Sequence, residues 1–358
     1  YRRQRQMCIR DRYKSGGRDN AEISQVPDPV CADTQVLIRV MACGICKPAD
    51  SSHDNATSML GEYPVIPGHE FAGIVEAVGK KVTRFKPGDR VAVDNGAPCM
   101  TCYYCQRGQF AFCENYKALG QSIDGGFAEL VVSPESHVYA VPGNVSMRAA
   151  ALSELVGCAY HCIDRCQIPQ AADVLILGSG ASGMLLAMLA KNTQAGTVTI
   201  IDSVKSKLKK IETKGVNTVL VDRSDYAVHE AELKRQFPKG FDVIIDACGN
   251  AQLIESSFEL LKAQGKFLNY SFASTDKKDI TLNMSLIARK ELSYMGTTFQ
   301  HHNFEQVLRS METGRVDPEF IISDVYPLDR YFEALDKNMS DSEAIKIIIE
   351  PNGPSEGR

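Results

Sequence analysis

The chain has 358 residues and a mass of 39.3 kDa, which is enough for two domains that each bury a full core. Its hydrophobic content of 44% and charged content of 23% are ordinary for a globular protein. Its net charge of −4 gives no reason to expect a nucleic acid or a membrane surface as partner. No apolar run reaches the roughly 18 residues that span a bilayer.

The first 12 residues are basic and carry no periodic pattern. They resemble a translated adapter or vector junction. A basic targeting arm is the alternative, but no apolar segment or small-residue cleavage site supports a secretory signal. We therefore set residues 1–15 aside as a non-native or disordered tail.

Beyond this tail, short apolar stretches alternate with turns rich in Gly and Pro. The pattern predicts strands at residues 36–40, 71–78, 90–93 and 125–132. Many short strands separated by such turns are typical of a small, barrel-like β domain. We assign residues 16–156 to this domain.

The pattern changes after Met147. An apolar helix is predicted at residues 149–162 and another at 184–191, and buried strands are predicted at 174–177, 198–201, 218–221, 242–245 and 266–269. Strands that alternate with helices indicate a doubly wound parallel sheet with right-handed crossovers, which we place at residues 157–297. A helix at 304–311 and strands at 321–326 and 344–349 follow. We expect residues 298–351 to return to the first domain and 352–358 to form a tail.

A glycine-rich loop follows the first strand of the predicted parallel sheet. Its glycines are Gly178, Gly180 and Gly183, in the pattern G-x-G-x-x-G, and Asp202 ends the next strand, 202 − 183 = 19 residues later. The glycines allow a pyrophosphate to approach the helix N-terminus, and the carboxylate accepts a hydrogen bond from a ribose 2′-hydroxyl. The unit predicts NAD rather than NADP, although Lys205 and Lys207 soften that preference.

Four cysteines, Cys99, Cys102, Cys105 and Cys113, lie on one loop. Four thiolates suit a tetrahedral zinc that is closed to water and therefore structural. An iron–sulfur cluster is the alternative, because C-x2-C-x2-C also occurs in ferredoxins. However, the fourth cysteine lies eight residues after the third and no proline follows it.

The cysteine clustering also bears on the cellular compartment. The chain has 12 cysteines, and in a chain of this size such clustering favours metal binding over disulfides. We therefore expect a reduced compartment and a cytoplasmic protein.

A second set of metal donors is dispersed along the chain: Cys46, His69, Glu70 and Glu154. Singly, the cysteine and histidine are as consistent with the core, and the two glutamates with salt bridges. Together, a thiolate, an imidazole and a carboxylate suit zinc with an open coordination position. From the residues alone, the catalytic-zinc and core interpretations are about equally supported.

The order of these elements resembles the zinc-dependent medium-chain dehydrogenase/reductase family. The matching segments are Cys43-Gly44-Ile45-Cys46, Gly68-His69-Glu70, the four-cysteine loop, Gly126-Phe127-Ala128-Glu129 and the nucleotide unit. They extend from about Gly16 to Pro351. The resemblance implies an α/β protein with a GroES-like β-barrel catalytic domain, an inserted Rossmann domain, and a homodimer or homotetramer.

Within that family the chain is most similar to the polyol branch, which includes sorbitol, xylitol and D-arabinitol dehydrogenases. Glu154 lies 178 − 154 = 24 residues before Gly178, where polyol enzymes carry a glutamate. The resemblance makes Cys46 and His69 ligands of a catalytic zinc. It divides the carboxylate role between Glu70 and Glu154, and leaves open which of them binds the metal.

One segment departs from the family pattern. After the ligand cysteine the family has Gly-Thr-Asp or Gly-Ser-Asp, whereas this chain has Lys47-Pro48-Ala49-Asp50. Proline has no hydroxyl, so the usual proton relay at that place is absent. Ser51, Ser52 or His53 are candidate substitutes, although a solvated loop is the simpler interpretation.

The implied function is the reversible oxidation of a secondary alcohol of a polyol, with zinc lowering the pKa of the hydroxyl and NAD accepting the hydride. A glucose- or threonine-type dehydrogenase of the same family is the alternative among enzymes. A non-catalytic protein that binds zinc and nucleotide is the alternative from another class. Two zinc ions per chain favour an enzyme, and one favours the non-catalytic protein.

Overall fold

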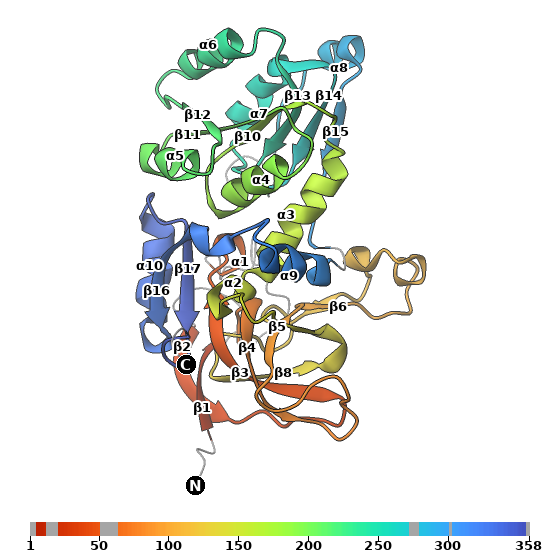
Figure 1. Ribbon diagram of the computed structural model, residues 1–358, viewed down its shortest axis with the longest axis vertical. Coiled ribbons are helices and arrows are strands. Elements are labelled where there is room, and N and C mark those ends of the chain that lie inside the picture. Colours follow the sequence, from red (N-terminus) through yellow and green to blue (C-terminus); the bar gives the residue numbers. More distant parts are fainter. Residues whose placement is uncertain (1–4, 12–20, 51–63, 272–278, 301–302, 356–358) are drawn as a thin grey trace. The chain divides into compact units, whose positions relative to one another are not determined.

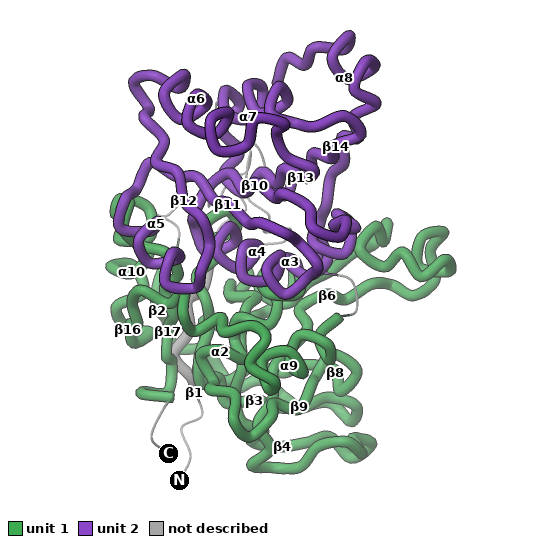
Figure 2. The backbone as a smooth tube through the Cα atoms, turned by 45° about the horizontal axis from the view of Figure 1, so that its top comes forward, with its two compact units in different colours: residues 1–157, 301–358 green, residues 158–300 purple. Residues whose placement is uncertain are grey.

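The structure is a computed structural model that describes residues 5–11, 21–50, 64–271, 279–300 and 303–355. The chain divides into two compact units, which are coloured separately in Figure 2. One unit comprises residues 1–157 and 301–358, and the other comprises residues 158–300. Two crossings of the chain therefore connect the units.

The first unit is built on a seven-stranded sheet in the order β16-β17-β3-β4-β5-β9, with β8 paired to β3. The strands are β3 (Gln35–Gly44), β4 (Glu70–Val78), β5 (Arg90–Val93), β8 (Leu130–Pro134), β9 (Val138–Ala140), β16 (Ile322–Pro327) and β17 (Lys346–Glu350). β17 pairs antiparallel with the end of β3, at Ile348↔Gly44 and Ile349↔Cys43. The C-terminal segment is thus part of the same sheet as the N-terminal strands.

Helices and short strands complete this unit. They are α1 (Lys47–Asp50), α2 (Met147–Ala151), α9 (Phe304–Glu312), α10 (Tyr331–Ser340), β6 (Gly96–Ala97) and β7 (Lys117–Ala118). The core of this unit is a cluster of buried side chains, in which the rings of Phe127 and Tyr331 lie 4.8 Å apart. Phe71, the residue that follows Glu70 on β4, belongs to the same cluster. Glu70 is thus the strand residue immediately before a core residue.

Two predicted elements differ from the structure. The strand expected at residues 125–132 begins only at Leu130, because the N–H groups of Gly125, Gly126 and Phe127 donate to carbonyls of residues 66–68. The helix expected at residues 149–162 is divided at Leu152 into α2 and α3 (Ser153–Cys166).

The second unit contains a six-stranded, fully parallel sheet in the order β12-β11-β10-β13-β14-β15 (Figure 1). The strands are β10 (Asp173–Leu177), β11 (Thr197–Asp202), β12 (Asn217–Leu220), β13 (Phe241–Asp246), β14 (Leu261–Asn269) and β15 (Ser293–Gly296). The helices are α4 (Ala181–Lys191), α5 (Lys205–Glu212), α6 (Tyr226–Gln236), α7 (Ala251–Ser257) and α8 (Met284–Lys290). The predicted doubly wound sheet is confirmed, and its strand order reverses between β10 and β13.

The segment set aside at the N-terminus has more order than the sequence predicts. Residues Arg5–Asp11 form β1, which pairs antiparallel with β2 (Ala21–Pro27). The other residues of the 1–15 segment lie outside the described part of the chain.

None of the described helices is long and apolar enough to cross a membrane.

Candidate functional site

The glycine-rich loop connects β10 to the N-terminus of α4, for which Gly180 is the N-cap. A Cβ at Gly183 would lie 1.8 Å from the carbonyl oxygen of Gly178, so only glycine lets the helix pack this closely on the loop. A Cβ at Gly180 would have no heavy atom within 4 Å. The second glycine therefore leaves an open backbone surface at a helix N-terminus, as pyrophosphate binding requires.

Asp202 ends the strand next to the glycine loop. β10 and β11 are parallel neighbours with Leu177 paired to Ile201, so Gly178 and Asp202 leave the sheet at the same edge. The carboxylate of Asp202 accepts hydrogen bonds from Ser179 and from the N–H of Val204. The structure thus brings together all four residues of the predicted nucleotide unit.

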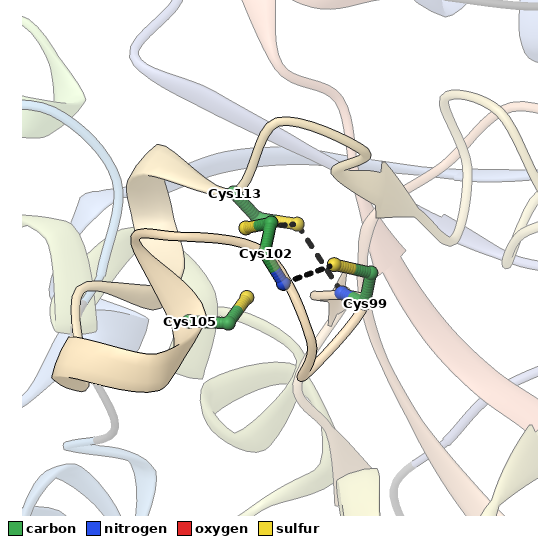
Figure 3. Close-up of side chains that lie close together, drawn as sticks. All are labelled: Cys99, Cys102, Cys105 and Cys113. Carbon is green, nitrogen blue, oxygen red and sulfur yellow. Dashed lines mark hydrogen bonds between the residues drawn. The ribbon is translucent and has the colours of Figure 1, made fainter.

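The four-cysteine loop has the form of a metal site. Figure 3 shows the side chains of Cys99, Cys102, Cys105 and Cys113 converging, and their sulfur atoms lie within 4.8 Å of one another. Backbone N–H groups of Cys99, Cys102 and Asn115 donate to these sulfurs at 3.2–3.4 Å. The eleven cysteines whose side chains are described are all free of disulfides. Four convergent sulfurs with N–H donors fit a structural zinc.

The thiols in this loop differ in acidity. Hydrogen bonds from the hydroxyl and N–H of Thr101 lower the pKa of Cys99 to about 5. Burial, followed by hydrogen bonds to Cys102 and Cys113, raises the pKa of Cys105 to about 12. A thiolate is the metal-binding form, so the loop already favours ionisation at Cys99 and needs a cation to favour it at Cys105.

Replacing Cys113 with Ser tests the loop. We expect metal content to fall from two zinc ions per chain to one, and residues 99–113 to become sensitive to limited proteolysis, because closed zinc sites contribute folding energy directly. Elemental analysis and proteolysis measure the two effects. Cys31→Ser, a free cysteine outside the cluster, is the control. Unchanged zinc content in the Cys113 variant would contradict the assignment.

A second group of metal donors lies around the start of β4. The antiparallel pairing of β3 with β4 places Glu70 opposite Gly44, while Cys46 follows β3 and His69 precedes β4. Donor atoms of Cys46, His69 and Glu70 lie within 4.8 Å of one another, and the histidine and glutamate are buried. Residues separated in sequence thus converge because two strands pair.

Two features of the backbone hold this group in place. The N–H groups of Gly125 and Gly126 donate to the carbonyls of Ile66 and Gly68 at 2.7 Å, which clamps the segment before His69. A Cβ at Gly44 would lie 2.3 Å from a carboxylate oxygen of Glu70, so glycine provides the space for that side chain. Gly44 and Gly126 belong to the sequence motifs at residues 43–46 and 126–129. Both glycines therefore help to hold the metal donors in place.

Glu70 forms a buried ion pair with Lys346. The ammonium of Lys346 lies 2.8 and 2.6 Å from the two carboxylate oxygens, and it also donates to the carbonyl of Ile45 at 2.8 Å. Burial lowers the pKa of Lys346, but the charges of Glu70 and Cys46 outweigh it, so the pKa is raised overall. Sequence reasoning missed Lys346, because it is 276 residues from Glu70 and only the pairing of β17 with β3 places it there.

Asp50 is a second residue that sequence reasoning missed. Its carboxylate is fully buried and accepts from the N–H of Cys46 at 2.7 Å, across the single turn of α1. Burial raises its pKa to about 6 despite the opposing charge of His69. Within the described residues, its other oxygen and Nδ1 of His69 have no hydrogen-bond partner. The spacing of four residues between Cys46 and Asp50, one helical turn, was the available signal.

Glu154 is buried in the first turn of α3 and acts on His69 through its charge. The donor group within 4.8 Å contains Cys46, His69 and Glu70, and does not include Glu154. Burial lowers the pKa of His69, but Cys46, followed by Glu154 and Asp50, raises it overall to about 10. Ser51, Ser52 and His53, the candidate proton relay, lie outside the described residues.

These residues fit a divalent cation. Three buried carboxylates (Asp50, Glu70 and Glu154) and the partly buried thiol of Cys46 lie around one lysine and one histidine, so carboxylates outnumber the basic groups. Uncompensated charge in such surroundings is costly, and a bound cation would neutralise it. Sulfur, imidazole and carboxylate donors are the ligands that zinc takes in sites with an open position.

Two family models match the chain. One, described as an alcohol dehydrogenase GroES-like domain, covers residues 32–143, and the other, described as a zinc-binding dehydrogenase, covers residues 181–313. The first includes Cys46, His69 and the four-cysteine loop, and the second includes Gly183 and Asp202.

Curated and solved relatives extend over nearly the whole chain. D-arabinitol dehydrogenase 1 of Uromyces fabae is 31% identical over 327 residues, which are 90% of this chain and 92% of the relative. D-altritol 5-dehydrogenase of Agrobacterium fabrum is 32% identical, over 91% of this chain and 95% of the relative. A crystal structure from Sinorhizobium meliloti, described as a zinc-binding dehydrogenase bound to NADP, superimposes with a TM-score of 0.89 at 28% identity and covers 98% of this chain and 100% of its own.

Proposed function

Since this chain belongs to the zinc-dependent medium-chain dehydrogenase/reductase family, we propose that it oxidises, reversibly, a secondary alcohol of a polyol or sugar alcohol, with NAD as the hydride acceptor. It is an alcohol or polyol dehydrogenase of the NAD(P)-dependent zinc class. The observation that carries the substrate class is the similarity to relatives named for arabinitol and altritol. The buried donor group of Cys46, His69 and Glu70 supports the chemistry.

The first step of the proposed mechanism is the positioning of the metal. Cys46, His69 and Glu70 would hold a zinc ion, which would supply a Lewis acid for the substrate hydroxyl. Lys346 orients the carboxylate of Glu70 and balances its charge. The buried carboxylate of Glu154, acting through water, would move the hydroxyl proton outward. The choice of Glu70 as the third ligand rests on its place in the donor group, and Glu154 is left for proton transfer.

The proposed cofactor site is the loop of Gly178, Gly180 and Gly183 together with Asp202. The loop would bind the pyrophosphate at the N-terminus of α4, and the carboxylate would accept a hydrogen bond from the adenosine ribose. A 2′-phosphate at that place would meet the negative charge of Asp202. NAD is therefore the proposed cofactor, although the Sinorhizobium meliloti relative holds NADP.

The two-domain organisation and the assembly are also proposals. Residues 16–156 with 298–351 form the catalytic domain, and residues 157–297 form the nucleotide domain. β15 is the last strand in the order of the six-stranded sheet, and Tyr294 on it is 47% exposed. An edge strand offers unpaired backbone groups to a second chain. This supports a homodimer or homotetramer, which we place in the cytoplasm.

A substrate panel tests the proposed function. Polyols, glucose and threonine are each offered with NAD and with NADP, and the absorbance of the reduced nicotinamide is followed. We expect turnover of polyols, the substrate class in the names of the relatives, and we expect it with NAD, because the charge of Asp202 would repel a 2′-phosphate. Preferential turnover of glucose or threonine would instead favour the alternative dehydrogenases. No turnover, together with a single zinc ion held by the four cysteines, would favour a non-catalytic protein.

A further inference from the structure

Ser179, the residue between the first two glycines of the loop, donates two hydrogen bonds to Asp202. Its N–H lies 2.6 Å and its hydroxyl 2.8 Å from Oδ2 of the aspartate. The serine is fully buried, and its hydroxyl is directed to the neighbouring strand. The pattern G-x-G-x-x-G requires no particular residue at this place, so the hydroxyl is a feature of this chain.

The hydrogen bonds of Asp202 determine which acceptor remains for a ligand. A carboxylate offers about four acceptor sites, two on each oxygen. The two groups of Ser179 use both sites of Oδ2, and the N–H of Val204, 2.9 Å away, uses one site of Oδ1. One acceptor site on Oδ1 is left. The aspartate is thus held in one orientation, with a single place for a hydroxyl donor.

We propose that Ser179 is a positioning residue for the choice of cofactor. By occupying Oδ2, it orients the remaining acceptor of Asp202 toward a ribose 2′-hydroxyl. It also fixes the negative charge of Asp202 where a 2′-phosphate would lie. The inference rests on the proposed use of NAD by this loop. Without the serine hydroxyl, Asp202 keeps the N–H donors of Ser179 and Val204 but loses one of its three hydrogen bonds, and Oδ2 gains an open acceptor site. The carboxylate is then held less firmly, so a 2′-hydroxyl has a less fixed partner and a 2′-phosphate meets less fixed repulsion. Discrimination between the two cofactors then falls.

The test compares cofactor binding in wild type and in Ser179→Ala, using the zinc-loaded protein. The chain contains no tryptophan whose fluorescence could be followed. Binding is therefore measured by the fluorescence of NADH and NADPH themselves. We expect the ratio of the two dissociation constants, NADPH over NADH, to fall about tenfold, as loss of a hydrogen bond to a charged group implies. A merely structural role would weaken both cofactors equally and leave the ratio unchanged.

Thr197→Val is the matched control. It also removes a hydroxyl that donates to an aspartate, Asp173, at 2.7 Å, but at the opposite end of β11. We expect this variant to keep the wild-type ratio. Ser179→Cys, which is close in volume and a weaker donor, should give an intermediate ratio and serves if the alanine variant does not fold.

The two hypotheses fail separately. The ratio in wild type tests the proposed preference for NAD, whereas the change in that ratio on replacing Ser179 tests the inference. A ratio that stays at the wild-type value in Ser179→Ala, or in Ser179→Cys, overturns the role of the serine. An equal fall in Thr197→Val overturns it as well.

Discussion

Replacing His69 with Ala is expected to lower kcat/KM for oxidation of the alcohol substrate by about three orders of magnitude or more, while NADH binds nearly as in wild type. The imidazole is one of the donors in the buried group with Cys46 and Glu70, and its loss removes the proposed metal site. Zinc contributes several kcal/mol of transition-state stabilisation, and each 1.4 kcal/mol is a factor of about ten in rate. Steady-state kinetics and nucleotide fluorescence measure the two quantities.

The metal content of the same variant separates this site from the four-cysteine loop. We expect one zinc ion per chain to be lost and the ion held by Cys99, Cys102, Cys105 and Cys113 to remain. His137→Ala is a matched control, because that histidine lies in a short 3-10 helix outside the donor group. Turnover by the His69 variant at a rate near that of wild type would remove the basis for a catalytic zinc.

Replacing Lys346 with Met is the second change with a large expected effect. Lys346 and Glu70 have side chains only 4% and 0% exposed, so the variant leaves a carboxylate buried without its cation. Breaking a buried pair at one partner costs about 3–5 kcal/mol. We expect the metal-free protein to lose this much free energy of unfolding, measured by chemical denaturation, with a corresponding fall in the thermal midpoint.

Two further variants test the reason for that loss. The double variant Glu70→Gln with Lys346→Met removes both charges and should recover most of the stability, because the penalty comes from the unpaired ion. Lys337→Met removes a lysine that is 33% exposed and pairs with Asp341, so its expected cost is below about 1 kcal/mol. Equal losses in the two lysine variants would show that burial of the pair is unimportant.

Local spacing was sufficient to predict two parts of the protein. The four cysteines fall within residues 99–113, and their convergence needs only one loop. The nucleotide unit likewise depends on a strand, a glycine turn and the next strand, so its residues are brought together by adjacent elements. The parallel sheet follows from the alternation of strands and helices, and it is confirmed. The prediction of a strand at residues 125–129 was wrong, because those N–H groups donate to the segment before His69.

The buried donor group shows the limit of that reasoning. The sequence by itself determined that Cys46, His69, Glu70 and Glu154 were candidates, and it predicted a nucleotide unit made of a glycine loop and Asp202 at the end of the next strand. Only the tertiary structure decided that Glu70 lies with Cys46 and His69, that it pairs with Lys346, and that Asp50 supports Cys46. The physical reason is that the pairing of β3 with β4 and β17 selects which distant side chains share a buried volume. Charges in that volume must then compensate one another, whatever their separation along the chain.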